Sequence, residues 1–125
     1  MLKTKILFHV LNIILIILYI YPGSILGYLI YGDFGKQPQL TTDFFEISSN
    51  HVYTFFLLSV LGFFAYHKDK KIFIINYLIL ISIILEILHL IIPNRGLQFG
   101  DLFGNILGVI LSIMIMNIFN YWRKR

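Results

Sequence analysis

Four stretches of this chain are apolar over the length needed to cross a lipid bilayer, and this feature limits the fold more than any other. They cover about residues 6–21, 48–66, 72–92 and 102–122. A membrane-spanning helix needs about 20 mainly apolar residues, because the hydrocarbon core is about 30 Å thick and each residue adds about 1.5 Å. We therefore predict an all-α protein, a four-helix transmembrane bundle that forms a single domain over residues 1–125.

The composition agrees with a membrane protein. Hydrophobic residues make up 58% of the chain, and the mean hydropathy of +0.84 exceeds what a soluble domain of this size could hide from water. The formal net charge is +4, but the basic residues lie beside apolar stretches and form no basic face. We therefore expect membrane lipids and no nucleic acid as partners. Cysteine is absent, which excludes disulfides, thiolate metal sites and cysteine nucleophiles.

The distribution of lysine and arginine predicts the orientation of the four spans. Only Lys36 and Arg95 lie on one side of the predicted membrane, and the opposite side carries Lys3, Lys5, Lys68, Lys70, Lys71, Arg123, Lys124 and Arg125. Cytoplasmic loops carry the excess of positive residues in membrane proteins. The sequence therefore predicts a multi-pass membrane protein with both termini in the cytoplasm.

The segment between the first two spans leaves one question open. The apolar stretch 25–31 follows Pro22 and is too short to cross a bilayer, so it either lies in the interface or prolongs the first helix beyond a kink. Tyr19 and Tyr21, at the end of the first span, are predicted to be interfacial anchors. Residues 32–50 have the polar, glycine- and proline-containing composition of a solvated loop.

Polar residues within the apolar helices predict one cluster near the outer surface. Glu86 lies inside the third span, seven residues before Pro93, and a carboxylate at that depth must face protein or water. The short connection between the third and fourth spans makes these helices antiparallel neighbours. Their outer ends, together with the start of the second span, therefore bring together His51, Glu86, His89, Arg95, Asp101 and Asn105.

Small residues on the last span predict a close helix contact. Gly104, Gly108 and Ser112 repeat every four residues, the small-xxx-small pattern that lets helix backbones approach each other in membranes. The sequence does not decide whether this seam packs within the chain or forms a homo-oligomer with another copy.

The residues from 86 to 108 resemble the signature of the VanZ-like membrane proteins. The resemblance lies in the order Glu86, Pro93, Arg95, Asp101, Asn105 and Gly108, and it extends over about residues 48–112. That family often has glutamine where His89 stands here, and an aspartate–lysine pair where Ile47 and Ser48 precede His51. The resemblance implies four spans in the cytoplasmic membrane of a bacterium, a place in the bacterial cell envelope and a link to glycopeptide resistance of the teicoplanin type.

Three functions fit this polar cluster. In the first, an outer-leaflet pocket binds an anionic lipid or lipid-linked glycan headgroup, with Arg95 as the donor to phosphate or carboxylate. In the second, the protein is a structural or partner-binding helix bundle, and Glu86, Arg95 and Asp101 form a buried ion-pair network. In the third, it is an intramembrane enzyme acting on a lipid-linked substrate, with Glu86 or His89 as general base.

No cofactor and no metal are predicted from the sequence. His51, Glu86, His89 and Asp101 could hold zinc only if the helices brought them within about 2 to 2.2 Å of the ion. Lone histidines in helices more often make structural hydrogen bonds. The ligand and any catalysed reaction stay open.

Overall fold

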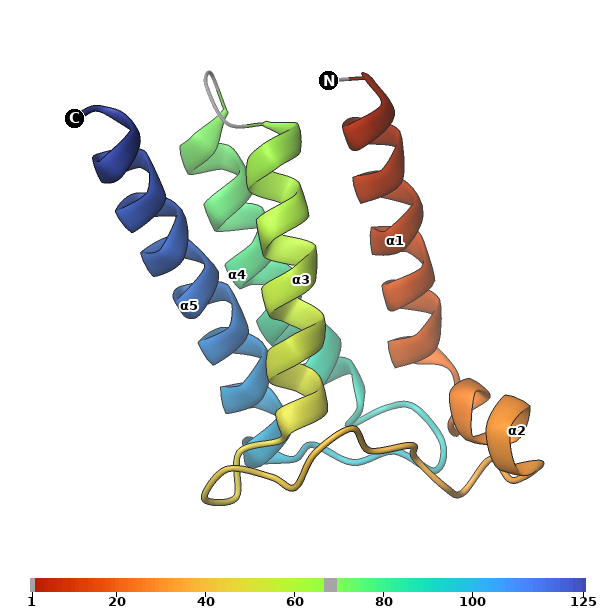
Figure 1. Ribbon diagram of the computed structural model, residues 1–125. Helices are drawn as coiled ribbons and strands as arrows, with labels where there is room; N and C mark the ends of the chain where they lie inside the picture. Colours follow the sequence, from red (N-terminus) through yellow and green to blue (C-terminus); the bar gives the residue numbers. More distant parts are fainter. Residues whose placement is uncertain (1, 67–69) are drawn as a thin grey trace.

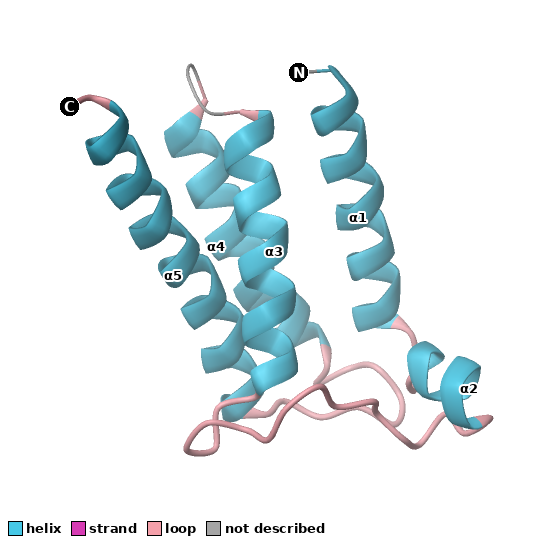
Figure 2. Ribbon diagram, viewed as in Figure 1, coloured by secondary structure: helices cyan, strands magenta, loops and turns pink. Residues whose placement is uncertain are grey.

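The computed structural model describes residues 2–66 and 70–125 and confirms the all-α class for them. The helices are α1 (Leu2–Ile20), α2 (Ile25–Tyr31), α3 (Ser49–Ala65), α4 (Lys71–Leu88) and α5 (Phe99–Arg123). The four long helices stand side by side, with both termini at one end of the molecule (Figure 1). The loops that precede α3 and α5, together with the short helix α2, lie at the opposite end (Figure 2).

Three of these helices are long and apolar enough to cross a membrane. They are α1, α4 and α5, each with at least 18 residues. The helix α3 is also apolar but has 17 residues, which corresponds to a rise of about 25 Å. Three membrane-length helices are therefore shown, whereas a fourth span at α3 stays a prediction.

The segment after α1 is a separate short helix. The Ser24 Oγ atom accepts a hydrogen bond from the Gly27 backbone N–H at 2.9 Å and so caps the start of α2. Gly32 ends α2 with a φ of 69°, a left-handed conformation that glycine adopts without strain. The chain also turns at Gly23, whose φ is 126°. Residues 25–31 therefore do not prolong α1 beyond a kink.

The third predicted span ends earlier than the sequence suggested. The helix α4 stops at Leu88, four residues before the predicted end at Ile92. Beyond it the chain tightens, and the Ile91 N–H bonds the Leu88 carbonyl oxygen at 3.0 Å, three residues back. This earlier turn lets the Gln98 backbone N–H return to the Glu86 carboxyl group at 3.0 Å.

The small-residue seam of α5 packs against α3 within the chain. A Cβ atom built on Gly104 would lie 2.7 Å from the Ser48 carbonyl oxygen, and one on Gly108 would lie 2.5 Å from that of Val52. Ser112 is fully buried on the same face. Only glycine therefore allows α5 to approach α3 this closely, and α3 covers these residues.

Candidate functional site

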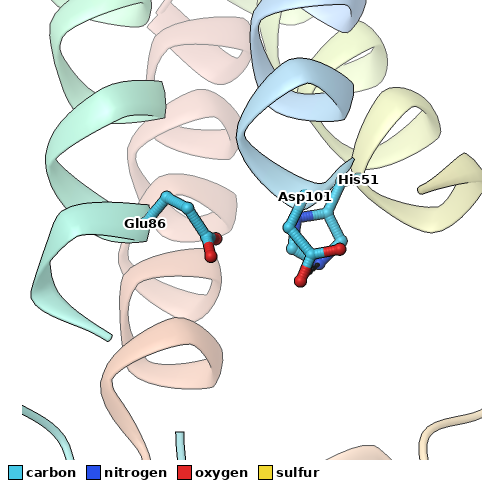
Figure 3. A group of neighbouring side chains, drawn as sticks. All are labelled: His51, Glu86 and Asp101. Atoms are coloured by element: carbon cyan, nitrogen blue, oxygen red, sulfur yellow. Dashed lines mark ion pairs between the residues drawn. The ribbon is translucent and has the colours of Figure 1, made fainter. Parts of the chain in front are cut away.

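The predicted polar residues come from three helices and one loop at the end of the bundle opposite the termini. The helix α3 provides His51, α4 provides Glu86 with His89 at its C-terminal cap, and α5 provides Asp101 and Asn105. Arg95 lies in the loop between α4 and α5. Figure 3 shows the Glu86 carboxylate directed from α4 towards His51 and Asp101, which overlap in this view.

The Glu86 side chain is fully buried and has protein partners, as predicted. Its exposed fraction is 0%. The Oε1 atom accepts a hydrogen bond from the Gln98 N–H at 3.0 Å and lies 3.2 Å from Nδ1 of His89. The Oε2 atom has no partner among the described residues. One carboxylate oxygen is therefore fixed, and the other has an unused bonding capacity.

His89 links Glu86 to the end of α1. Its Nε2 atom lies 3.0 Å from the Tyr19 carbonyl oxygen, which can only accept, so Nε2 carries a proton. Its Nδ1 atom faces Glu86 Oε1, and a second proton must lie between these two atoms for a hydrogen bond to form. The pair is therefore neutral in total, whichever of the two groups holds that proton.

His51 is held in one orientation by Asn105. The Asn105 Nδ2 atom donates to the Ser82 carbonyl oxygen at 3.0 Å, which directs Oδ1 towards His51. That Oδ1 atom accepts from the Tyr19 hydroxyl at 2.8 Å and lies 2.9 Å from His51 Nδ1. The Tyr19 hydroxyl also lies 2.9 Å from His51 Nδ1, but its proton is directed to Asn105 Oδ1. Because that amide oxygen only accepts, the hydrogen bond at His51 Nδ1 assigns the ring proton to Nδ1. The His51 Nε2 atom then faces Asp101 Oδ2 at 3.6 Å.

Arg95 connects the α4–α5 loop to the end of α1. Its Nη2 atom donates to the carbonyl oxygens of Leu18 at 3.0 Å and Gly23 at 2.6 Å, and its Nε atom donates to that of Tyr21 at 3.2 Å. Leu18 lies in the last turn of α1, where carbonyl groups lack partners within the helix and carry partial negative charge, and Tyr21 and Gly23 lie in the turn that follows α1.

These contacts correct the expected ion-pair network. Among the described residues, Arg95 forms no ion pair with Glu86 or Asp101, whose ionisable partners are His89 and His51 respectively. Partial burial lowers the pKa of the Arg95 guanidinium, while the two carboxyl groups act in the opposite direction. Arg95 instead donates to the carbonyl oxygens of Leu18, Tyr21 and Gly23.

Tyr19 belongs to this site, and its interpretation as an interfacial anchor was wrong. It is 8% exposed, and its ring stacks on that of His89 with centroids 5.7 Å apart. The sequence did contain a signal for this burial. The buried residues Phe8, Asn12, Leu15 and Tyr19 recur at intervals of four, three and four, which is the spacing of one helix face.

A polar cavity lies beside the cluster. Its volume is about 340 Å³, at the lower end of the range of ligand pockets. His89, Arg95 and Asp101 line it, and the remaining lining residues are Gln37, Gln39, Asp43, Ser48, Asn50, Asn94, Gly96 and Gln98. The cavity is therefore bordered by the two loops at this end of the bundle and by the buried cluster.

Comparisons with protein-family models, curated proteins and solved structures found no match to this chain. The similarity of residues 86–108 to the VanZ-like signature thus depends on those residues alone and stays a prediction.

Proposed function

We propose that this chain is a VanZ-like, multi-pass protein of the bacterial cytoplasmic membrane whose cavity binds the polar headgroup of a lipid-linked glycan or an anionic lipid. The observation that carries the proposal is the lining of the cavity. Amide, hydroxyl and charged side chains dominate it, and they lie at one end of a set of membrane-length helices. A ligand with a polar head and apolar tails fits such a position.

The free amides of the cavity favour a headgroup rich in hydroxyl groups. Within the described residues, the side chains of Gln37, Asn94 and Gln98 line the cavity and make no hydrogen bond of their own. Each amide can both donate and accept, as hydroxyl groups do. A glycan therefore matches this lining better than a simple fatty acid would.

Arg95 supports recognition of a phosphate beside the glycan. Its Nε and Nη2 atoms are used by carbonyl groups, but its Nη1 atom makes no hydrogen bond to the described residues. Arg95 also lines the cavity. A guanidinium held in place by α1 can donate through Nη1 to an anionic oxygen with little loss of side-chain entropy.

The proposal includes four spans with the cavity on the outer side. Most positive residues lie at the end of the bundle where both termini lie (Figure 1). They are Lys3, Lys5, Lys70, Lys71, Arg123, Lys124 and Arg125. Lys68, which the sequence analysis counted with them, lies outside the described residues. The positive-inside rule then directs this end to the cytoplasm. A place in the cell envelope and a link to glycopeptide resistance follow from the VanZ-like resemblance.

Single cysteines test this topology, because the native chain has none. Cysteine at Gln39 in the long loop should react with a membrane-impermeant maleimide in intact cells. Cysteine at Lys124, which is exposed beyond the predicted fourth span, should react only after the membrane is permeabilised. Labelling of Lys124→Cys in intact cells would contradict the proposed orientation.

A binding measurement tests the ligand. Purified protein in detergent is titrated with a short-chain polyprenyl-diphosphate disaccharide and, separately, with phosphatidylglycerol. Replacing Gln98 by alanine removes a free amide but keeps the backbone N–H that Glu86 needs, so affinity should fall about three- to tenfold, the equivalent of one hydrogen bond. Asn120→Ala is the matched control, because this exposed amide lies on α5 at the opposite end.

Each result has a clear meaning for the three functions considered. Tighter binding of the disaccharide lipid, weakened by Gln98→Ala and unchanged by Asn120→Ala, supports the proposal. Binding of neither probe favours a structural bundle. Conversion of the disaccharide lipid to a product during the titration would favour an intramembrane enzyme.

A further inference from the structure

Three side chains from three helices place metal-ligating atoms close together, and the proposed headgroup site does not require that arrangement. One ligating atom each from His51, Glu86 and Asp101 lies within 4.8 Å of the other two. The residues come from α3, α4 and α5, so the fold and not the local sequence creates the group. Figure 3 shows the three side chains facing a common region.

The tautomer of His51 leaves one ring nitrogen free for an ion. Its Nδ1 atom donates to Asn105 Oδ1 at 2.9 Å, and Asn105 is itself fixed by the Ser82 carbonyl oxygen at 3.0 Å. A histidine that binds a metal typically donates its other ring N–H to an oxygen of this kind. The lone pair of Nε2 is then directed towards Asp101.

The separation of His51 and Asp101 fits two ligands of one ion. Nε2 and Oδ2 are 3.6 Å apart, too far for a charge-assisted hydrogen bond of about 2.7 to 2.9 Å. Two ligand atoms at about 2.0 to 2.2 Å from a tetrahedral ion lie about 3.3 to 3.6 Å apart. The observed spacing therefore leaves room for an ion between the two atoms.

Glu86 supplies the second, independent observation. Its Oε2 atom is buried and has no partner among the described residues, while Oε1 is held by the Gln98 N–H and by His89. Leaving a buried carboxylate oxygen unpaired is costly. Coordination through Oε2 would remove that cost, and the contacts of Oε1 would orient the carboxylate, as hydrogen bonds to ligating side chains do in metal sites.

We propose that His51, Glu86 and Asp101 bind one divalent transition-metal ion. One imidazole and two carboxylates suit Zn²⁺ or Mn²⁺ better than Mg²⁺, because Mg²⁺ prefers ligand sets made of oxygen. The Asp101 carboxylate offsets one charge of the ion, and Glu86, whose pair with His89 is neutral in total, supplies Oε2 as a ligand. Asp101 also lines the polar cavity, so an ion held there is reachable from that cavity and keeps a coordination position for water or a ligand oxygen.

This inference departs from the prediction of no metal. Spacing in the sequence could not show that Asn105 fixes the His51 tautomer or that Glu86 keeps a free oxygen. His89, which the sequence had grouped with these ligands, is not one of the three. Its two ring nitrogens are engaged by the Tyr19 carbonyl oxygen and by Glu86.

The test measures metal binding by the purified full chain after treatment with EDTA. Titration with ZnCl₂, MnCl₂ and MgCl₂, followed by elemental analysis, should show one Zn²⁺ or Mn²⁺ per chain and weak Mg²⁺ binding. His51→Asn keeps a donor near the Nδ1 position but removes Nε2, and Asp101→Asn keeps the side-chain shape. Each should weaken Zn²⁺ binding by about 100-fold or more.

His9→Asn is the matched control. It makes the same substitution on α1, where His9 bonds the Tyr66 hydroxyl at 2.6 Å, and it should leave Zn²⁺ affinity unchanged. Equal affinity of wild type and His51→Asn would overturn the proposal, since the ion would then bind elsewhere. The absence of stoichiometric Zn²⁺ and Mn²⁺ binding would overturn it as well.

A measurement on the unsubstituted chain avoids variants that fail to fold. Electron spin-echo spectra of the Mn²⁺-loaded protein should show the coupling of a coordinated imidazole nitrogen, and its absence from a stoichiometric complex would refute His51 as a ligand. Binding of the disaccharide lipid in EDTA tests the proposed function alone. The metal site and the headgroup site can therefore fail separately.

Discussion

Replacing Gly108 by alanine tests the contact that positions the whole site. The added Cβ atom would lie 2.5 Å from the Val52 carbonyl oxygen and 2.8 Å from the Phe56 nitrogen. Both atoms belong to the α3 backbone and cannot rotate away. Ordinary contact begins at 3.4 Å, so α3 and α5 must separate by about 0.9 Å. Overpacking of this kind costs about 1 to 3 kcal/mol, and a rigid backbone neighbour places the expected loss in the upper half of that range.

The assay is unfolding of purified protein by SDS in mixed micelles, followed by near-ultraviolet circular dichroism. Gly96→Ala is the matched control, because nothing lies within 4 Å of a Cβ atom at Gly96, and it should change the unfolding free energy by less than about 0.5 kcal/mol. If Gly108→Ala unfolds at the same SDS fraction as Gly96→Ala, the close approach of α3 and α5 does not exist.

Three further substitutions test individual contacts. Tyr19→Phe keeps the ring but removes a donor to Asn105, and the same unfolding assay should show a loss of about 0.5 to 1.5 kcal/mol; an unchanged stability would mean that the hydroxyl makes no useful bond. Arg95→Ala removes three hydrogen bonds to carbonyl groups in the last turn of α1 and in the turn after it. It should speed hydrogen exchange there but not in α3, and unchanged protection at the end of α1 would contradict these bonds. Glu86→Leu leaves the Gln98 N–H unpaired and should lower the free energy of unfolding by about 3 to 5 kcal/mol. Glu86→Gln keeps an acceptor oxygen and should lower it by less. Equal losses in the two variants would refute the hydrogen bond between Gln98 and Glu86.

The sequence alone determined where the long helices lie and where the polar cluster forms. Apolar runs report a preference that each segment has by itself, because transfer of its side chains from water does not depend on which neighbour covers them. The same reasoning identified Glu86 as a member of the polar cluster, since a carboxyl group in an apolar helix must face polar protein groups or water. Gly104 and Gly108 predicted a close helix contact, but their spacing did not name the partner helix.

The tertiary structure decided which groups meet. Arg95 donates to backbone carbonyl groups in and after the last turn of α1 instead of pairing with Glu86, because unpaired carbonyl groups at a helix end also attract a guanidinium. Every residue has a carbonyl group, so the sequence does not show which ones are unpaired. Tyr19, in the last turn of α1, is buried because its ring packs against the rings of His89 and His51. The orientation of the His51 ring depends on Asn105, 54 residues away, and the Glu86 carboxylate is held by the backbone of Gln98, 12 residues away across a turn. Hydropathy is a property of each segment, whereas hydrogen-bond partners are a property of the assembled fold.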